Sequence, residues 1–357
     1  MLGIETFFLK ALHKPVLNRF DESFVLLHNR RMHTTMKKIG VFTSGGDAPG
    51  MNPAIRSVVR TAVNRGVEVI GIMHGYVGMI ENSMRTLQMR DVANIIQRGG
   101  TILKTGRSAE FLKPEYRTVA AQNLKAIGVE GLVCIGGDGS FRGAQTLFSE
   151  HKVPVVGIPG TIDNDVFGTD DTIGYDTAVN TALQAIDKIR DTADSHDRIF
   201  IVEVMGRNSG WIASQVGLAG GAEEILTSDN VVTVDKIVEN LKNSRQRGKT
   251  SSIIITAEGQ KPGRAYDLSE AIRKKSGLDA KVCILGHQQR GGSPTAHDRI
   301  LASRLASSAV DALLSGKTNT MIGTSGGQLV EVPLEIVTSK EKPGDKTLIN
   351  LARLLSV

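Results

Sequence analysis

Gly131-Leu-Val-Cys-Ile-Gly-Gly-Asp-Gly-Ser140 is the stretch that decides the fold of this 357-residue chain. A short apolar run that opens into glycines is typical of a buried parallel strand followed by a helix. Glycines let backbone N–H groups approach an anion closely. Although a Gly-rich turn with one aspartate also occurs without any ligand, the stretch predicts a phosphate site at the carboxyl end of a parallel sheet.

Two more strands end in the same manner. Val153–Ile158 opens into Pro159-Gly-Thr-Ile-Asp-Asn-Asp165, and Lys37–Phe42 opens into Thr43-Ser-Gly-Gly-Asp-Ala-Pro-Gly-Met-Asn52. A helix predicted over Met51–Arg65 would point its amino end at an incoming phosphate. Three such loops together favour a nucleotide site over a purely structural role. The first loop lacks the lysine of a Walker motif and the spaced glycines of a dinucleotide fingerprint.

Three aspartates fall in these loops. Asp138, Asp163 and Asp165 supply oxygen ligands for Mg²⁺ and a carboxylate that can take a hydroxyl proton, which are the needs of phosphoryl transfer from a nucleotide. Asp165 has three open roles: binding a metal-bound water, orienting Asp163 or capping the following turn.

The rest of the chain alternates strand and helix, so we expect an α/β protein with two three-layer αβα sandwich domains and mostly parallel sheets. Further strands are predicted at Val67–Ile72, Arg198–Val204, Ser252–Thr256 and Lys281–Leu285. A helix over Ala178–Thr192 is predicted to pass from one domain to the other.

Loops of the second domain carry the chemistry that a phosphorylated acceptor needs. Arginine, lysine and histidine suit a phosphate monoester, and a glutamate can accept from sugar hydroxyls. The candidates are Arg198, Arg207, Glu258, Lys281, His287 and Arg290.

Composition narrows the function further. The net charge of +6 is spread along the chain and aromatic residues make up only 4%, so we expect no nucleic-acid partner. Two cysteines, Cys134 and Cys283, indicate a reducing, cytoplasmic setting without disulfides. No apolar stretch approaches the roughly 18 residues of a membrane span. Residues 1–35 lack the strand pattern, and we expect them to be a non-native or disordered extension before a start at Met36.

From Met36 onward the chain resembles the bacterial ATP-dependent 6-phosphofructokinases. The resemblance rests on five ordered motifs: TSGGDAPGMN (43–52), GGDGS (136–140), PGTIDND (159–165), VEVMGR (202–207) and LGHQQRGGSP (285–294). It implies a homotetramer, Mg²⁺ with ATP as donor and fructose 6-phosphate as acceptor. It also implies an ATP-binding domain (36–174 with about 288–336) and a sugar-phosphate domain (175–287 with about 337–357).

Roles are implied residue by residue. Asp163 matches the general base and Asp138 the magnesium-linked aspartate, with Thr161 beside the base. The nucleotide contacts would be Gly46, Arg107, Gly137, Asp138, Gly139 and Ser140. The sugar-phosphate contacts would be Thr161, Asp163, Met205, Gly206, Arg207, Glu258, His287 and Arg290. Arg198 and Lys281 match residues that reach in from a neighbouring subunit, and Lys281 stands where an arginine is usual.

Two further implications concern the donor and regulation. Pyrophosphate-using relatives carry Asp and Lys where this chain has Gly139 and Gly160, so ATP is favoured as donor. An effector site for ADP and phosphoenolpyruvate between subunits is implied by Arg56, Arg60, Arg190, Glu223, Arg247 and Lys249. The alternatives are a pyrophosphate-dependent phosphofructokinase and a non-catalytic sugar-phosphate sensor.

Overall fold

The computed structural model describes residues 36–356, and the prediction for residues 1–35 lies outside this range. A first sheet has seven strands in the order β11-β10-β5-β4-β1-β2-β3. The strands are β1 (Lys38–Ser44), β2 (Glu68–Ile72), β3 (Met84–Leu87), β4 (Gly131–Gly136), β5 (Val155–Pro159), β10 (Thr320–Ser325) and β11 (Gln328–Pro333). Only the outer strands β3 and β11 pair antiparallel.

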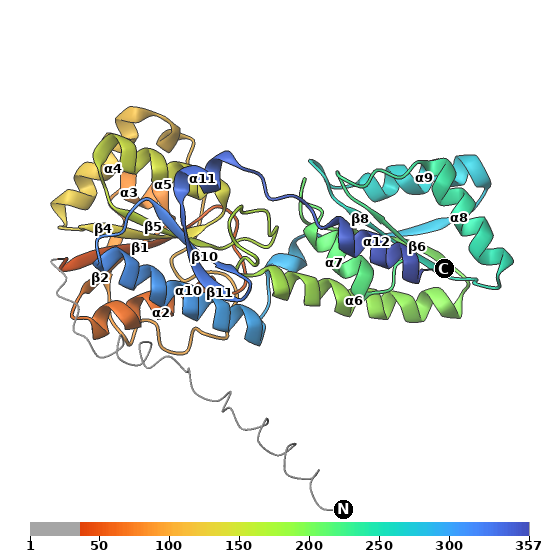
Figure 1. Ribbon diagram of the computed structural model, residues 1–357, viewed down its shortest axis with the longest axis horizontal. Coiled ribbons are helices and arrows are strands. Elements are labelled where there is room, and N and C mark those ends of the chain that lie inside the picture. Colours follow the sequence, from red (N-terminus) through yellow and green to blue (C-terminus); the bar gives the residue numbers. More distant parts are fainter. Residues whose placement is uncertain (1–35, 357) are drawn as a thin grey trace, which may run out of the picture. The chain divides into compact units, whose positions relative to one another are not determined.

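Helices cover both faces of this sheet (Figure 1). On one face lie α2 (Met51–Asn64) and α10 (Ala296–Leu314); on the other lie α3 (Tyr76–Ile80), α4 (Pro114–Ala126), α5 (Asp138–His151) and α11 (Leu334–Ser339), with the short helix η1 (Glu110–Leu112) beside α4. β4 is buried along its whole length because helices pack on both of its sides. Phe42 of β1 and Phe141 of α5 are fully buried in the core between the sheet and these helices.

A second sheet has four parallel strands in the order β7-β8-β6-β9. Its strands are β6 (Ile199–Val204), β7 (Glu224–Leu226), β8 (Ser252–Ala257) and β9 (Ala280–Ile284). One face packs α6 (Tyr175–Ser195) and α7 (Trp211–Ala219), with α12 (Lys346–Leu355) outside α7; the other packs α8 (Val234–Gln246) and α9 (Arg264–Ser276). The short helix η2 (Gly286–Arg290) follows β9 and contacts α6.

The two mostly parallel sheets confirm the predicted fold class. The predicted helices over 51–65 and 178–192 are present as α2 and the longer α6. The chain changes sheets three times, through α6, between η2 and α10, and through residues 340–345. Because the described residues all belong to one compact unit, the exact limits of the two domains stay a prediction. Within residues 36–356, no helix combines the length and apolar character of a membrane span.

Candidate active site

Strands β1, β4 and β5 end side by side at a cleft of about 790 Å³. Carboxyl ends of parallel strands are where such sheets place ligands. The cleft brings together most of the predicted nucleotide and catalytic residues. Those that line it are Gly46, Arg107, Gly137, Asp138, Gly139, Ser140, Thr161, Asp163, Asp165, Arg207 and Arg290.

Asp163 is the buried carboxylate of this cleft, with 5% of its surface exposed. Its backbone is fixed at both ends: its N–H donates to Thr161 Oγ1 (3.2 Å) and its C=O accepts from Ser209 Oγ (2.6 Å). Its Oδ1 atom has no hydrogen-bond partner among the described residues. A buried acceptor without a partner is costly in a folded protein, so this oxygen is available to a ligand's hydroxyl.

Charges around Asp163 act in opposite directions. Burial raises the pKa of its carboxyl, Arg290 and Arg207 lower it, and Glu258 raises it. Arg290 approaches the first loop closely, because a Cβ added at Gly46 would lie 2.6 Å from Arg290 Nη1. Arg290 Nη1 also donates to Asp47 O (3.3 Å). Two cations therefore lie near the Asp163 carboxylate, where a transferring phosphoryl group would need them.

Asp138 and Asp165 add negative charge to the same cleft. Asp138 opens α5 and pairs with Arg142 on the next turn. Burial raises the pKa of Asp138, and Asp165 raises it further. The pKa of Asp165 is raised by desolvation and then by Asp163, although its side chain remains open to solvent.

The described residues contain no cluster of three or more metal-binding side chains. Mg²⁺ in kinases is usually held by one or two carboxylates together with substrate phosphates, and Asp138 fits such a partial site. Burial is the main cause of its raised pKa, and a cation bound at this carboxylate would favour the charged form.

Gly139 and Gly160, the two positions that bear on the choice between ATP and pyrophosphate, differ in their surroundings. A Cβ added at Gly139 meets no atom within 4 Å, whereas one at Gly160 would lie 3.0 Å from Ile135 Cγ2. The direction that a side chain would take at Gly139 is therefore open. At Gly160 the Cβ direction leads into the core beside Ile135, which the sequence could not reveal.

The cleft is also lined by an aromatic pair, Tyr76 and Phe111, which the sequence did not indicate as part of the site. The rings of Tyr76 and Phe111 stack with centroids 4.0 Å apart, and Tyr76 Oη donates to Ser140 O (2.6 Å). Leu112 follows with 79% of its surface exposed. The only available signal was the apolar pair Phe111-Leu112 in an otherwise polar stretch.

The sugar-phosphate loops follow β6, β8 and β9. Met205 is buried, and its N–H donates to Oε1 of the fully buried Gln289 (2.8 Å). Gly206 has φ 131° and its Cβ would lie 2.9 Å from Ser209 O, so only glycine fits there. Glu258 follows β8 within electrostatic reach of Asp163, and His287 lies exposed in η2. None of Met205, Gly206, Glu258 and His287 is among the residues that line the cleft itself.

Arg198 and Lys281 lie near the amino ends of strands β6 and β9, whereas the sugar-phosphate loops follow the carboxyl ends of these strands. Arg198 precedes β6, and Lys281 pairs in register with Phe200 near the start of β9. Lys281 Nζ contacts Asp279 Oδ2 at 2.7 Å, and both cations are exposed. The sequence analysis predicted that they lie with the other cations at strand ends. In the structure, the length of β6 lies between these two residues and the cleft.

The predicted effector residues fall into two groups within one chain. Arg56 and Arg60 share α2; burial and then Arg60 lower the pKa of Arg56, and Arg60 Nε has no hydrogen-bond partner within residues 36–356. The other group surrounds the second sheet: Arg190 donates to Gly221 O (2.9 Å), and Lys249 pairs with Glu223 (2.5 Å).

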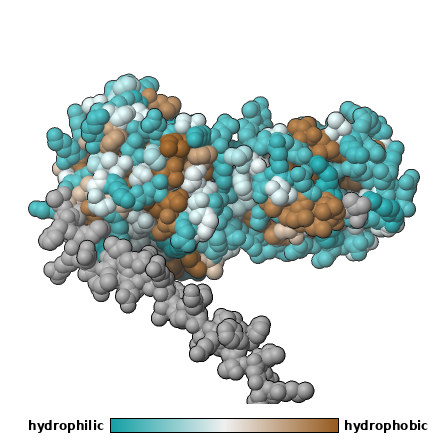
Figure 2. All heavy atoms as spheres, in the orientation of Figure 1, coloured by the Kyte–Doolittle hydropathy of each residue, from teal (hydrophilic) through white to brown (hydrophobic). Residues whose placement is uncertain are grey.

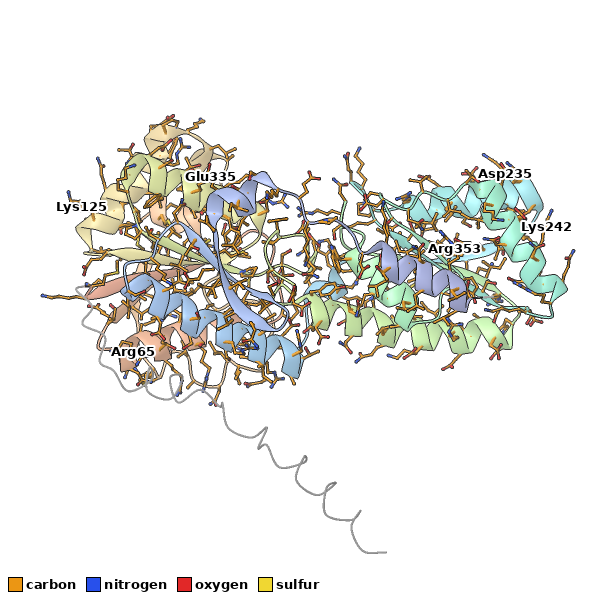
Figure 3. All side chains as sticks on the ribbon, viewed as in Figure 1. Arg65, Lys125, Asp235, Lys242, Glu335 and Arg353 are labelled. Carbon is orange, nitrogen blue, oxygen red and sulfur yellow. The ribbon has the colours of Figure 1, made fainter. Side chains whose placement is uncertain are left out.

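A cavity of about 400 Å³ lies beside this second group. It is lined by Glu223 and Arg247 together with Lys236 from α8 and Arg353 from α12. Arg353, labelled in Figure 3, also donates to Asn230 Oδ1 (3.3 Å). Nearby, Figure 2 shows an apolar patch over α12, where Leu351, Leu354 and Leu355 are exposed.

Comparisons with known proteins agree with this geometry. Residues 38–313 match the family model described as Phosphofructokinase. The chain therefore belongs to the phosphofructokinase family.

Within the family, the similar relatives have a more particular name. A Thermus thermophilus protein named ATP-dependent 6-phosphofructokinase 1 is 58% identical over 322 residues, which cover 90% of this chain and 100% of the relative. The ATP-dependent 6-phosphofructokinase of Halothermothrix orenii is 51% identical over 332 residues, which cover 90% and 100%.

Solved structures show the same fold. Phosphofructokinase from Saccharomyces cerevisiae aligns with TM-score 0.79 and 36% identity over 90% of this chain and 48% of that one, so this chain spans about half of the yeast chain. A pyrophosphate-dependent phosphofructokinase from Marinobacter aquaeolei aligns with TM-score 0.78 over 90% and 91%; at 22% identity it supports the fold alone.

Proposed function

We propose that this chain is an ATP-dependent 6-phosphofructokinase, a glycolytic kinase that phosphorylates the 1-hydroxyl of fructose 6-phosphate to give fructose 1,6-bisphosphate. The observation that carries the proposal is the unpartnered, buried Oδ1 of Asp163, held between the glycine loops and two arginines. The full-length similarity to relatives named for this activity supports it.

The reaction is an in-line transfer in which positioning and charge neutralisation lower most of the barrier. Asp163 Oδ1 accepts the proton of the sugar hydroxyl while that oxygen bonds to the γ-phosphorus and the bond to the bridging β–γ oxygen breaks, releasing ADP. Arg207, Arg290 and the backbone amides of Gly45 and Gly46 stabilise the charge on the transferring group. Thr161 keeps Asp163 in place through its backbone.

Mg²⁺, bound with the nucleotide, would neutralise phosphate charge, and Asp138 is the residue that would hold it. On the nucleotide side, Gly137, Gly139, Ser140 and Arg107 would receive the phosphates. On the acceptor side, Met205, Gly206, Glu258 and His287 would receive the sugar phosphate, as the family resemblance implies.

The choice of donor is tested at Gly139, where added volume points into open space. Gly139→Asp should lower kcat/KM for Mg-ATP by about 10-fold or more, because a carboxylate beside a phosphate is a like-charge contact. Ser149→Asp, which adds the same charge at an exposed position of the same helix, is the control. Steady-state turnover of fructose 6-phosphate is measured with Mg-ATP and with Mg-pyrophosphate.

Either of two outcomes would contradict this assignment. Wild-type turnover with pyrophosphate alone would mean that Gly139 and Gly160 do not set the donor. No turnover with either donor would favour a sugar-phosphate sensor that retains the pockets without the reaction.

Shared sites in a homotetramer are part of the proposal, since Arg198 and Lys281 lie far from the cleft of their own chain. Arg198→Ala and Asp163→Asn should each be impaired alone, yet a mixture that is unfolded and refolded together should regain activity. With random pairing across a two-fold interface, about a quarter of the sites combine both native residues. Activity of the mixture equal to the average of the two parents would contradict shared sites, as would an active monomer on sizing.

A regulatory anion site for ADP and phosphoenolpyruvate is proposed from the same symmetry. Arg56 and Arg60 of one subunit would face Arg190, Glu223, Arg247 and Lys249 of another. The lowered pKa of Arg56 and the unpartnered Arg60 Nε are what a site awaiting an anion would display.

A further inference from the structure

Residues 340–345, the last passage of the chain between the two sheets, place a lysine against the loop that holds Asp163. Lys342 Nζ donates to Asn164 Oδ1 (3.0 Å) and to Asp170 O (2.6 Å). The same ammonium lies 4.5 Å from the centroid of the Trp211 ring, at the start of α7. Lys342 therefore joins the catalytic loop, the second sheet's α7 and the C-terminal segment at one point.

Asn164 is the residue through which this contact reaches the catalytic carboxylates. It stands between Asp163 and Asp165, is 1% exposed and has φ 49°. This left-handed backbone is unfavourable for residues other than glycine, although asparagine tolerates it better than most. Both ends of its amide are occupied, because Nδ2 donates to Asp170 O (3.2 Å) and Oδ1 accepts from Lys342. The Lys342 contact thus fixes the side chain of a residue with a strained backbone next to the base.

A second anchor holds the same loop. Ser209 Oγ donates to Asp163 O (2.6 Å) and accepts from the Trp211 N–H (3.3 Å). The two anchors meet at Trp211, whose ring faces Lys342 and whose backbone faces Ser209. With Lys342 removed, the loop would be held by Ser209 alone among these contacts.

We propose that Lys342 is a positioning residue of the phosphoryl transfer: its ammonium fixes Asn164 and thereby the direction of the Asp163 carboxylate. This role rests on the proposed function, because it assumes that Asp163 is the base. A misplacement of a catalytic group by about 1 Å can lower the rate by up to roughly 100-fold.

The protonation of Lys342 supports a functional reason for its burial. Burial lowers the pKa of Lys342 to about 8. The negative charges of Asp171, Asp170 and Asp165 act in the opposite direction and raise this pKa. Between this value and about 10.4, where an exposed lysine titrates, the unfolded chain binds more protons than the folded one. Stability therefore rises with pH over that window, so the buried charge opposes folding below it. The ammonium is not retained for stability.

The test compares Lys342→Met and Lys342→Arg with the control Lys340→Met. Lys340 is exposed in the same segment and faces the Phe167 ring at 5.2 Å. We expect Lys342→Met to lower kcat about 10-fold, with KM for Mg-ATP changed less than about 2-fold and Tm within about 3 °C of wild type. Lys342→Arg should restore most of kcat and move the alkaline fall in kcat, expected near pH 8 in wild type, to higher pH.

Trp211 is the chain's single tryptophan, so its fluorescence reports this contact without any turnover. Wild-type emission should change with a midpoint near pH 8, and Lys342→Met should lack this transition.

Three results would overturn the proposal. They are wild-type kcat in Lys342→Met, an equal loss in Lys340→Met, or a loss that follows Tm and is not rescued by arginine. A wild-type protein inactive with both donors would overturn the proposed function itself, and this role with it.

Discussion

Replacing Asp163 with asparagine should lower kcat for fructose 6-phosphate by about 10²–10⁴-fold, or ~3–5 kcal/mol, while the affinity for Mg-ATP stays close to wild type. Asparagine keeps the size of the side chain but cannot take a proton at neutral pH. The nucleotide loops lie on other strand ends, so their geometry should not depend on this charge. Stopped-assay kinetics for kcat and equilibrium binding of Mg-ATP measure the two effects separately.

Asp171→Asn is the matched control for this substitution. Asp171 belongs to the same loop, but its carboxylate faces His297 at 3.3 Å and does not line the cleft. Near-normal kcat in Asp163→Asn would remove Asp163 from the role of base. A comparable loss in Asp171→Asn would mean that the loop responds to any change of charge.

Asp298→Ala should lower the free energy of unfolding by about 3 kcal/mol, the largest stability effect expected here. Asp298 lies on α10, is fully buried and accepts from Gly174 N (2.8 Å), Thr177 N (2.8 Å) and Thr177 Oγ1 (2.5 Å). These groups form the start of α6, and alanine would leave two buried N–H donors unsatisfied. Urea unfolding followed by circular dichroism measures the change.

Asp298→Asn serves as the comparison, because its carbonyl oxygen still satisfies one donor. It should lose clearly less stability than Asp298→Ala. If the alanine variant lost under about 1 kcal/mol, the buried carboxylate would not be what holds α6 to α10.

The sequence predicted the central strands of both sheets because their β-branched runs are buried on both faces, as in β4 and β8. It missed β3, β7, β10 and β11. β7 has three residues, and β11 is a partly exposed edge strand without an apolar run. Short strands and edge strands such as β3, β7 and β11 are defined by their neighbours in the sheet, which local sequence patterns do not record.

The residues of the site also differ in whether the sequence could predict their positions. Asp138 and Asp163 could be predicted because each follows a strand, and parallel strands bring their carboxyl ends together. The position of Lys342 could not be predicted. It lies 178 residues from Asn164, in a charged Pro-Gly segment that resembles an ordinary linker. Likewise, no local pattern indicated that Arg198 and Lys281 would lie near the amino end of β6, away from the cleft.

The order of strands in the first sheet has a consequence for synthesis of the chain. β5 ends at Pro159, but its partner β10 begins only at Thr320, after every strand of the second sheet has been made. On the ribosome, the emerging β5 therefore presents an unpaired, fully apolar edge while β6 to β9 are translated. Such edges invite pairing with other chains. The nascent protein is thus most exposed to aggregation midway through translation, and chaperone capture should be strongest in that interval.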